Sequence, residues 1–168
     1  MGDINATDLA QIGHVNLLRE HGAAGSDVLG TYTEPLPSGS VAQFIMVDDN
    51  IVTRVLPRVD HQAQTESGCY EGADADLLAK GDEAYAAAPL EPKLSKRFRF
   101  STHFTCLGAS VDGDEGFVAA SGEFLVQVLG LINAILRAGL ASGEVLSLLS
   151  GCLAHSLQYR RPAWCYVD

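Results

Sequence analysis

The pattern of apolar and polar positions in the first third of the chain predicts a helix followed by a β-hairpin. Residues 5–20 repeat leucine, isoleucine and valine at helical spacing and are followed by Gly22, as at many helix ends. Residues 41–47 and 51–56 are rich in β-branched and aromatic side chains, and the acidic residues of 48–50 separate them. Two such runs around a short polar apex indicate a hairpin.

The middle of the chain alternates between irregular and periodic segments. Residues 22–40 and 57–72 contain polar residues and glycine without a hydrophobic period, which predicts loops. Residues 74–88 place leucine, alanine and tyrosine along one side and stop at a proline, which predicts a helix. Residues 97–107 alternate as a strand does, and residues 111–118 hold Asp-Gly-Asp-Glu-Gly, which predicts a turn between two short strands and so a second hairpin.

The last third of the chain predicts two helices. The segments 121–137 and 142–159 both begin with Ser-Gly-Glu, which puts a capping hydroxyl and an acid at the positive end of each helix dipole. Helices joined by a short connection pack antiparallel. The order of elements is therefore helix, hairpin, helix, hairpin and helix pair, which predicts an α+β fold.

Charge is unevenly distributed along the chain. The formal net charge of −10 argues against a nucleic-acid binder held by its overall charge. Residues 1–92 hold 4 basic and 15 acidic residues, whereas residues 93–168 hold 7 and 6, so positive charge is concentrated in the second part. Four of its basic residues form a cluster, which a solvated surface would explain as well as a binding site: Lys93, Lys96, Arg97 and Arg99.

Cysteine and histidine spacing gives no metal or disulfide pattern. The four cysteines are irregularly spaced, at positions 69, 106, 152 and 165, which predicts reduced thiols in an intracellular protein. The five histidines lack zinc-type spacing with these cysteines, so no structural metal is expected. Neither a secretory leader nor an apolar run long enough for a membrane span is evident, so we expect a soluble protein without a membrane partner.

The strongest candidate for chemistry is the segment Met46-Val47-Asp48-Asp49 at the apex of the first predicted hairpin. Adjacent carboxylates repel each other unless a cation or solvent compensates. Mg²⁺ is bound in proteins by one or two carboxylates together with water and substrate phosphates, and paired metals serve phosphoryl transfer. Asp-Asp-Asn is also a favourable turn sequence without any function, so both interpretations remain open at this point.

Four stretches follow one another in an order that resembles the palm of retroelement reverse transcriptases, with the final helices in the place of the thumb. They are the glycine-containing loop and helix at 1–11, the Asp-Asp hairpin at 46–49, the helix, spacer and lysine at 86–96, and the hairpin at 104–108 with 112–116. The resemblance implies a partial palm-like subdomain over residues 1–120 and a thumb-like helical subdomain over residues 121–168.

The resemblance also implies RNA-directed DNA polymerase chemistry, a two-metal nucleotidyl transfer that uses Mg²⁺, an RNA template, a DNA primer and dNTPs. Asp48 and Asp49 would be the catalytic residues and metal ligands of this chain. Lys96, or Lys93 in its place, would protonate the pyrophosphate leaving group. The other residues that the resemblance places against nucleotide or nucleic acid are Gly2, Gln11, Lys93, Arg97, Arg99 and Gly108.

The family pattern is incomplete in this sequence. It needs a further metal-binding aspartate on an upstream strand and a fingers region, and neither is found before the hairpin; Met46 also stands where many relatives have an aromatic residue. We therefore expect the isolated chain to be inactive, with a missing N-terminal polymerase part as a partner and a nuclear location by resemblance. The alternatives are a non-catalytic retroelement-derived interaction module and an unrelated α+β domain.

Overall fold

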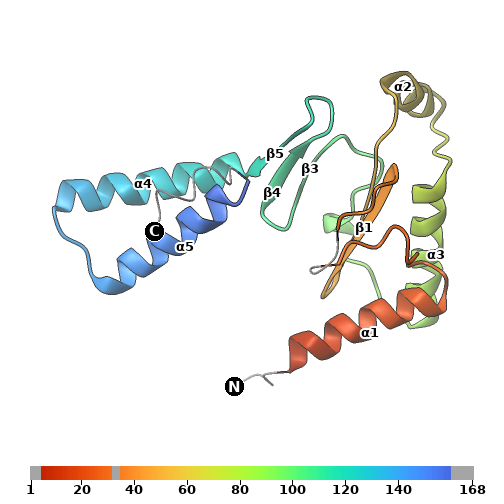
Figure 1. Ribbon diagram of the computed structural model, residues 1–168, viewed down its shortest axis with the longest axis horizontal. Helices are drawn as coiled ribbons and strands as arrows, with labels where there is room; N and C mark the ends of the chain where they lie inside the picture. Colours follow the sequence, from red (N-terminus) through yellow and green to blue (C-terminus); the bar gives the residue numbers. More distant parts are fainter. Residues whose placement is uncertain (1–4, 32–34, 160–168) are drawn as a thin grey trace. The chain divides into compact units, whose positions relative to one another are not determined.

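The structure of the chain is a computed structural model that describes residues 5–31 and 35–159 (Figure 1). The chain divides into two compact units, Met1–Arg97 and Phe98–Asp168. This division falls ahead of the one expected after residue 120, so the second sheet groups with the two C-terminal helices. Helices and antiparallel strands occur in both units, which confirms the α+β class.

The first unit contains a hairpin and its helices. In chain order its elements are α1 (Ala6–Glu20), β1 (Val41–Met46), β2 (Asp49–Arg54), α2 (Arg58–Ser67), α3 (Ala73–Ala87) and the 3-10 turn η1 (Leu94–Lys96). The strands pair antiparallel, from Val41 opposite Arg54 to Met46 opposite Asp49, so the predicted hairpin is confirmed. Helices α1 and α3 are the predicted ones, shifted by at most one residue at each end.

The core of the first unit lies where α1, β1 and α3 meet. Leu18, Ile45 and Ala84, one from each element, are buried and form one cluster with Ala23 from the loop behind α1. Alternate residues of β1 are buried, as expected for a strand with one face on a core. Removing this apolar surface from water holds the hairpin between the two helices.

Helix α2 was not predicted, because residues 57–72 were expected to be a loop. Its N-cap position is Pro57, Asp60 lies in its first turn, and Gly68 ends it in the left-handed conformation. These are ordinary helix start and stop signals. None of its residues is buried. The segment therefore lacks the hydrophobic period from which the other helices were predicted.

The second unit combines a three-stranded meander with a helix pair. Its elements are β3 (His103–Cys106), β4 (Ala109–Asp112), β5 (Phe117–Ala120), α4 (Gly122–Ala138) and α5 (Gly143–Leu157). The strands pair antiparallel in the order β3-β4-β5. Ser121 and Ser142 accept hydrogen bonds from Phe124 N and Val145 N, so both predicted helix caps are confirmed.

The strand predicted over residues 97–107 is shorter than expected. Only His103–Cys106 is strand, and Phe100 has a positive φ of 51°. The rings of Phe98 and Phe104 stack with centroids 4.9 Å apart. Residues six apart on an extended strand would be about 20 Å apart, so this aromatic contact requires the chain to turn back between them.

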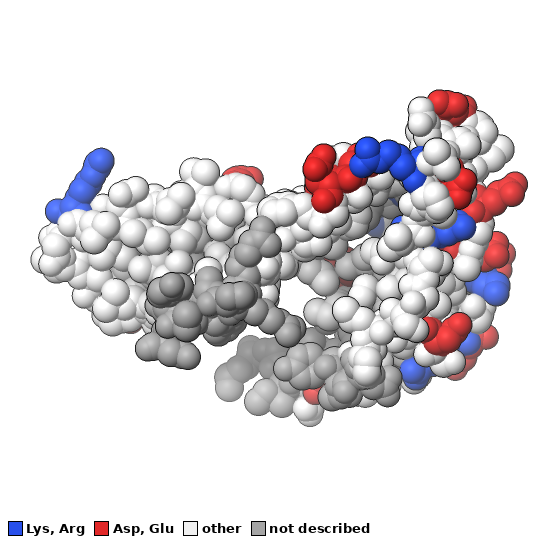
Figure 2. All heavy atoms as spheres, turned by 45° about the horizontal axis from the view of Figure 1, so that its top comes forward, with Lys and Arg blue, Asp and Glu red and all other residues white. Residues whose placement is uncertain are grey.

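The surface of the second unit differs in character from that of the first. On the face drawn in Figure 2, charged side chains gather over the first unit, and the helix pair presents mainly uncharged atoms. Large apolar side chains of both helices are exposed, among them Val126, Leu136 and Leu148. In the part of the chain that the structure describes, no helix is both long and apolar enough to cross a membrane.

Candidate functional site

The two candidate metal ligands lie at the end of the β1–β2 hairpin. The register leaves only Val47 and Asp48 as turn residues, because Asp49 already pairs with Met46 and belongs to β2. The turn is therefore tighter than the three-residue apex expected from the sequence. Both Asp48 and Asp49 are exposed to solvent, and carboxylates in such a position can take up a hard cation together with water.

Two side chains of α1 bind the backbone of this turn. Gln11 receives a hydrogen bond from Val47 N at 2.6 Å and donates to Ile45 O at 2.8 Å. His14 approaches Val47 O with Nδ1 at 2.8 Å. A carbonyl oxygen only accepts, so Nδ1 must carry the proton. The resemblance placed Gln11 against nucleotide and template, and the structure places its carboxamide on the hairpin backbone.

Helix α3 also contacts His14, the residue of α1 that binds the turn. The Nε2 atom of His14 lies 2.8 Å from the Tyr85 hydroxyl on α3. When Nδ1 holds the proton of the neutral ring, Nε2 accepts and the Tyr85 hydroxyl donates. The ring orientation of His14 is therefore fixed at both nitrogens, by Val47 of the turn and by Tyr85.

The side chain of Gln43 connects β1 to β2 and to the loop after α1. It is fully buried, and its Nε2 donates to Ala23 O at 2.8 Å and to Asn50 Oδ1 at 2.9 Å. Its Oε1 is buried without a protein partner. The hydrogen bond from Gln43 to Asn50 joins β1 to the residue after Asp49. It explains why Asn50, which was expected in the apex of the hairpin, belongs to β2 instead.

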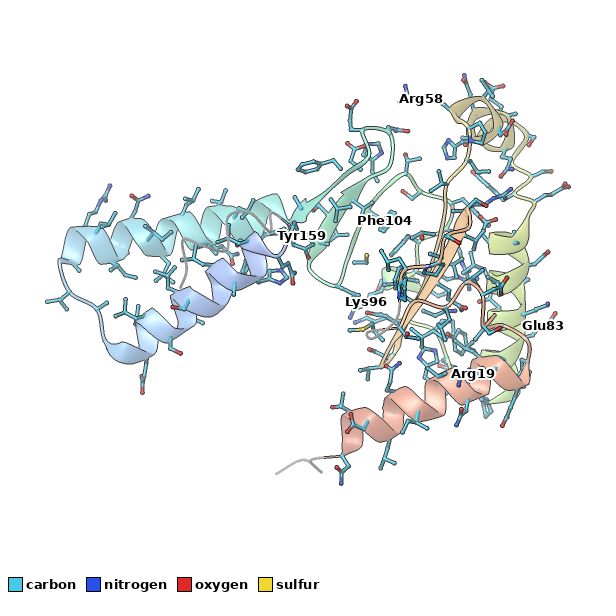
Figure 3. The ribbon with its side chains drawn as sticks, in the orientation of Figure 1. Arg19, Arg58, Glu83, Lys96, Phe104 and Tyr159 are labelled. Atoms are coloured by element: carbon cyan, nitrogen blue, oxygen red, sulfur yellow. The ribbon has the colours of Figure 1, made fainter. Side chains whose placement is uncertain are left out.

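The basic residues implied by the resemblance lie after α3. Lys93 directly precedes η1 and is exposed. Lys96 ends η1 and is also exposed (Figure 3). Arg97 forms an ion pair with Asp82 of α3, with 2.6 Å between Nη2 and Oδ2. Arg99 belongs to the second unit and has bonding partners within the protein. Gly2 lies outside the described residues.

Gly108 takes a packing position in the second unit. It lies in the tight turn between β3 and β4 with a φ of +77°. A Cβ atom built there would come within 3.0 Å of His155 Nε2 on α5. His155 also packs edge-on against Phe124, with ring centroids 5.1 Å apart. Contact with α5 thus accounts for glycine at this position.

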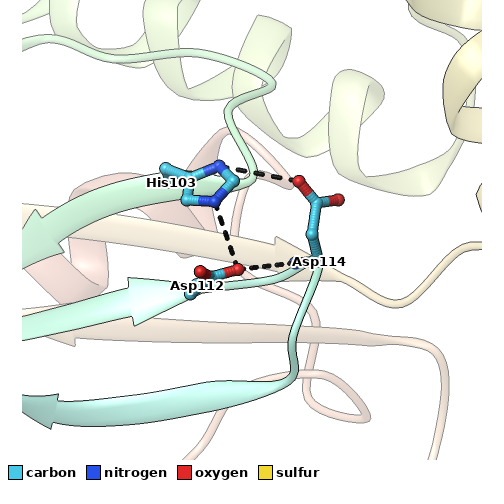
Figure 4. A group of neighbouring side chains, drawn as sticks. All are labelled: His103, Asp112 and Asp114. Carbon is cyan, nitrogen blue, oxygen red and sulfur yellow. Dashed lines mark hydrogen bonds and ion pairs between the residues drawn. The ribbon is translucent and has the colours of Figure 1, made fainter.

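A further group of side chains of the types that can ligate a metal was not singled out from the sequence. His103, Asp112 and Asp114 offer ligand atoms within 4.8 Å of one another (Figure 4). His103 Nε2 lies 3.2 Å from Asp112 Oδ1, and its Nδ1 lies 3.7 Å from Asp114 Oδ2. Asp-Gly-Asp was visible as a turn sequence, but the position of His103 opposite Asp112 depends on the strand register.

The protein itself already provides partners within this group. Asp112 Oδ1 accepts hydrogen bonds from the backbone N–H groups of Glu115 and Asp114, both at 3.0 Å. The Glu115 N–H contributes most to lowering the pKa of the Asp112 carboxyl below its ordinary 3.8; desolvation opposes this, and His103 and the Asp114 N–H lower the pKa further. The two carboxylates face opposite ring nitrogens, so a single ion would have to displace one of these contacts.

Comparisons with known proteins do not extend this description. No family model, curated protein or solved structure matches the chain.

Proposed function

We propose that the chain is a reverse-transcriptase-like fragment whose β1–β2 hairpin binds Mg²⁺ through Asp48 and Asp49. The observation that carries the proposal is the tight turn that presents these two exposed carboxylates at the end of an antiparallel hairpin. The order of the surrounding elements supports it in part, because a helix, the hairpin, a small antiparallel sheet and a helix pair follow one another as the resemblance implies, although two helices, α2 and α3, stand where one was expected.

The donor set at the turn fits Mg²⁺ in kind. Carboxylate oxygens are hard ligands of the type that this ion prefers, with water completing the coordination. When bound in a polymerase, Mg²⁺ stabilises the attacking and leaving oxygens of nucleotidyl transfer. In this chain, Asp48 and Asp49 would hold the ion, and Lys96 would donate a proton to the leaving pyrophosphate.

These 168 residues by themselves are proposed to bind the ion without catalysing DNA synthesis. The described aspartates ahead of the hairpin, Asp8 and Asp27, lie on α1 and in the following loop rather than on a strand. Two adjacent carboxylates are too few for a pair of closely spaced metals. RNA template, DNA primer and dNTP would then be partners of the complete polymerase, to which a further N-terminal part contributes.

Counting bound Mn²⁺ by electron paramagnetic resonance tests the ion site, with Mn²⁺ as the probe for Mg²⁺. We expect one site that Asp48→Asn or Asp49→Asn removes and that Asp112→Asn leaves intact. The last variant is the matched control, because it alters the other acidic group near a possible metal. Loss of the site in Asp112→Asn, with retention in the hairpin variants, would overturn the assignment.

A primer-extension assay with Mg²⁺, an RNA template and a DNA primer tests the second part of the proposal. The isolated chain should extend the primer at the rate of the Asp48→Ala variant, which is the background of the assay. Extension well above this background would show that these residues suffice for DNA synthesis and would overturn this part of the proposal.

The helix pair favours a second candidate, a non-catalytic retroelement-derived interaction module. Val126, Leu136 and Leu148 expose 69%, 72% and 62% of their surface, and a large exposed apolar patch is one mark of an interaction surface. Light scattering coupled to size-exclusion chromatography tests this candidate. Association that Val126→Ser and Leu136→Ser abolish would support it, and a stable monomer would remove its physical basis.

A further inference from the structure

The hairpin turn that carries Asp48 is held in a strained conformation by side chains of α1. Val47 has a φ of +49°, a region that tight hairpin turns usually give to glycine. For a β-branched residue the left-handed region is unfavourable, because Cβ comes too close to the following carbonyl oxygen. Such strain persists only where the surroundings fix it, and it gathers at functional sites.

The contacts that fix Val47 come from one face of α1. Gln11 and His14 are three residues apart and therefore neighbours on the helix surface. Gln11 accepts from Val47 N at 2.6 Å, and His14 lies 2.8 Å from Val47 O. Both backbone polar groups of Val47 are thus bound by this helix, directly before the first candidate ligand.

The rest of the hairpin is held independently of these contacts. Six residue pairs form the ladder from Val41 to Arg54. Gln43 N donates to Val28 O at 2.7 Å, and Gly30 N donates to Gln43 O at 2.8 Å, which anchors β1 on its other edge. The bonds from Gln11 and His14 act at the turn itself, so they determine its conformation more than the existence of the hairpin.

We propose that Gln11 and His14 are positioning residues that hold the Val47 peptide so that the Asp48 and Asp49 carboxylates are arranged for ion binding. The proposal rests on the metal-binding function proposed for this hairpin. In this proposal α1 fixes the backbone of the turn, whereas the resemblance implied that it contacts nucleotide. Tyr85 extends this role to α3, because its hydroxyl lies 2.8 Å from His14 Nε2.

The test combines Mn²⁺ affinity with the intraresidue HN–Hα NOE of Val47, which is strong at a positive φ and weak at a negative φ. In Gln11→Ala and His14→Ala this NOE should weaken, and Mn²⁺ affinity should fall by about tenfold, as for other groups that orient metal ligands. Gln62→Ala on α2 and His21→Ala at the end of α1 are matched controls, since neither contacts the turn in the structure. Both controls should keep the wild-type values.

Val47→Gly separates positioning from a general loss of stability. Glycine adopts a positive φ without strain, so adding Val47→Gly to Gln11→Ala should restore part of the lost Mn²⁺ affinity. If Gln11→Ala lowered Mn²⁺ affinity only through a general loss of stability, adding Val47→Gly would not restore the affinity. Failure of the glycine to restore affinity would overturn the positioning role.

Failure of the two proposals can be told apart. If the wild-type chain binds no Mn²⁺, the proposed function of the hairpin fails, and the HN–Hα NOE of Val47 still decides whether α1 sets the turn. An NOE that stays at its wild-type strength in both Gln11→Ala and His14→Ala would overturn the inference, whatever the ion does.

Discussion

Arg54 and Asp74 form an ion pair that joins the end of β2 to the first turn of α3, with 2.9 Å between Nη1 and Oδ1. Both side chains are largely shielded from solvent, and the same Nη1 also donates to Glu71 O at 2.8 Å. The ion pair joins the two ends of the connection that contains α2. It also links β2, the strand that begins with Asp49, to α3, a helix of the core.

Asp74→Asn should lower the free energy of unfolding by about 1.5 kcal/mol, because a charge-assisted and partly buried hydrogen bond is weakened. Asp76→Asn is the matched control, since Asp76 lies in the same first turn of α3 and is exposed. Urea denaturation of both variants measures the difference. Equal effects would show that the helix dipole, rather than Arg54, makes Asp74 important.

Gly108→Ala should destabilise the second unit. The substitution adds a Cβ at a φ of +77° and places it against His155 Nε2, and a left-handed alanine alone costs about 1 kcal/mol. Gly130→Ala in α4 is the control, because nothing lies within 4 Å of its Cβ position and alanine favours a helix. Thermal unfolding should give a lower midpoint for the first variant and a higher one for the second.

Protonation of Asp112 should destabilise the sheet of the second unit at low pH. The pKa of its carboxyl in the folded chain is lowered from 3.8, so the charged form contributes stability above 3.8 that is lost as the pH falls through the folded value. Asp112→Asn should therefore be less stable than wild type at neutral pH, and the difference should shrink below pH 3.8.

NMR titration of the Asp112 carboxyl measures this pKa directly. Asp114→Asn serves as a control, because its backbone N–H still donates to Asp112 and the low pKa should persist. A midpoint at or above 3.8 for Asp112 in the wild-type chain would contradict the hydrogen-bonding explanation.

Ser142→Ala should weaken α5 by about 1 kcal/mol, the usual cost of losing a hydroxyl N-cap. The Ser142 side chain accepts from Val145 N at 3.3 Å. Ser147→Ala, an exposed change inside the same helix, should be neutral or slightly stabilising. Circular dichroism during thermal unfolding compares the two, and equal losses would show that the cap contributes nothing.

Elements with a strong local signal were predictable from the sequence. The caps Ser121 and Ser142, the apolar runs of β1 and β2, and the periodic segment of α3 each carry their own pattern. Helix α2 buries no residue, so its periodicity was absent. The start of β3 at His103 could not be predicted either, because it depends on the stacking of Phe98 and Phe104.

The arrangement around the candidate site depends on contacts distant in the sequence. The turn at Asp48 was predictable because acidic residues interrupt two β-rich runs, whereas Asp49 was expected in the apex and belongs to β2. The bond between Gln11 and Val47 joins residues 36 positions apart, and it exists only once α1 packs on β1. The pairing of His103 with Asp112 likewise depends on strand register, which composition does not fix.

Paramagnetic broadening of amide signals by Mn²⁺ shows whether the β1–β2 turn binds a divalent ion. We expect saturable broadening centred on the amides of Val47, Asp48, Asp49 and Asn50, and its loss in Asp48→Asn. Broadening centred instead on His103, Asp112 and Asp114, or none at any concentration of Mn²⁺ that leaves the chain folded, would contradict this expectation.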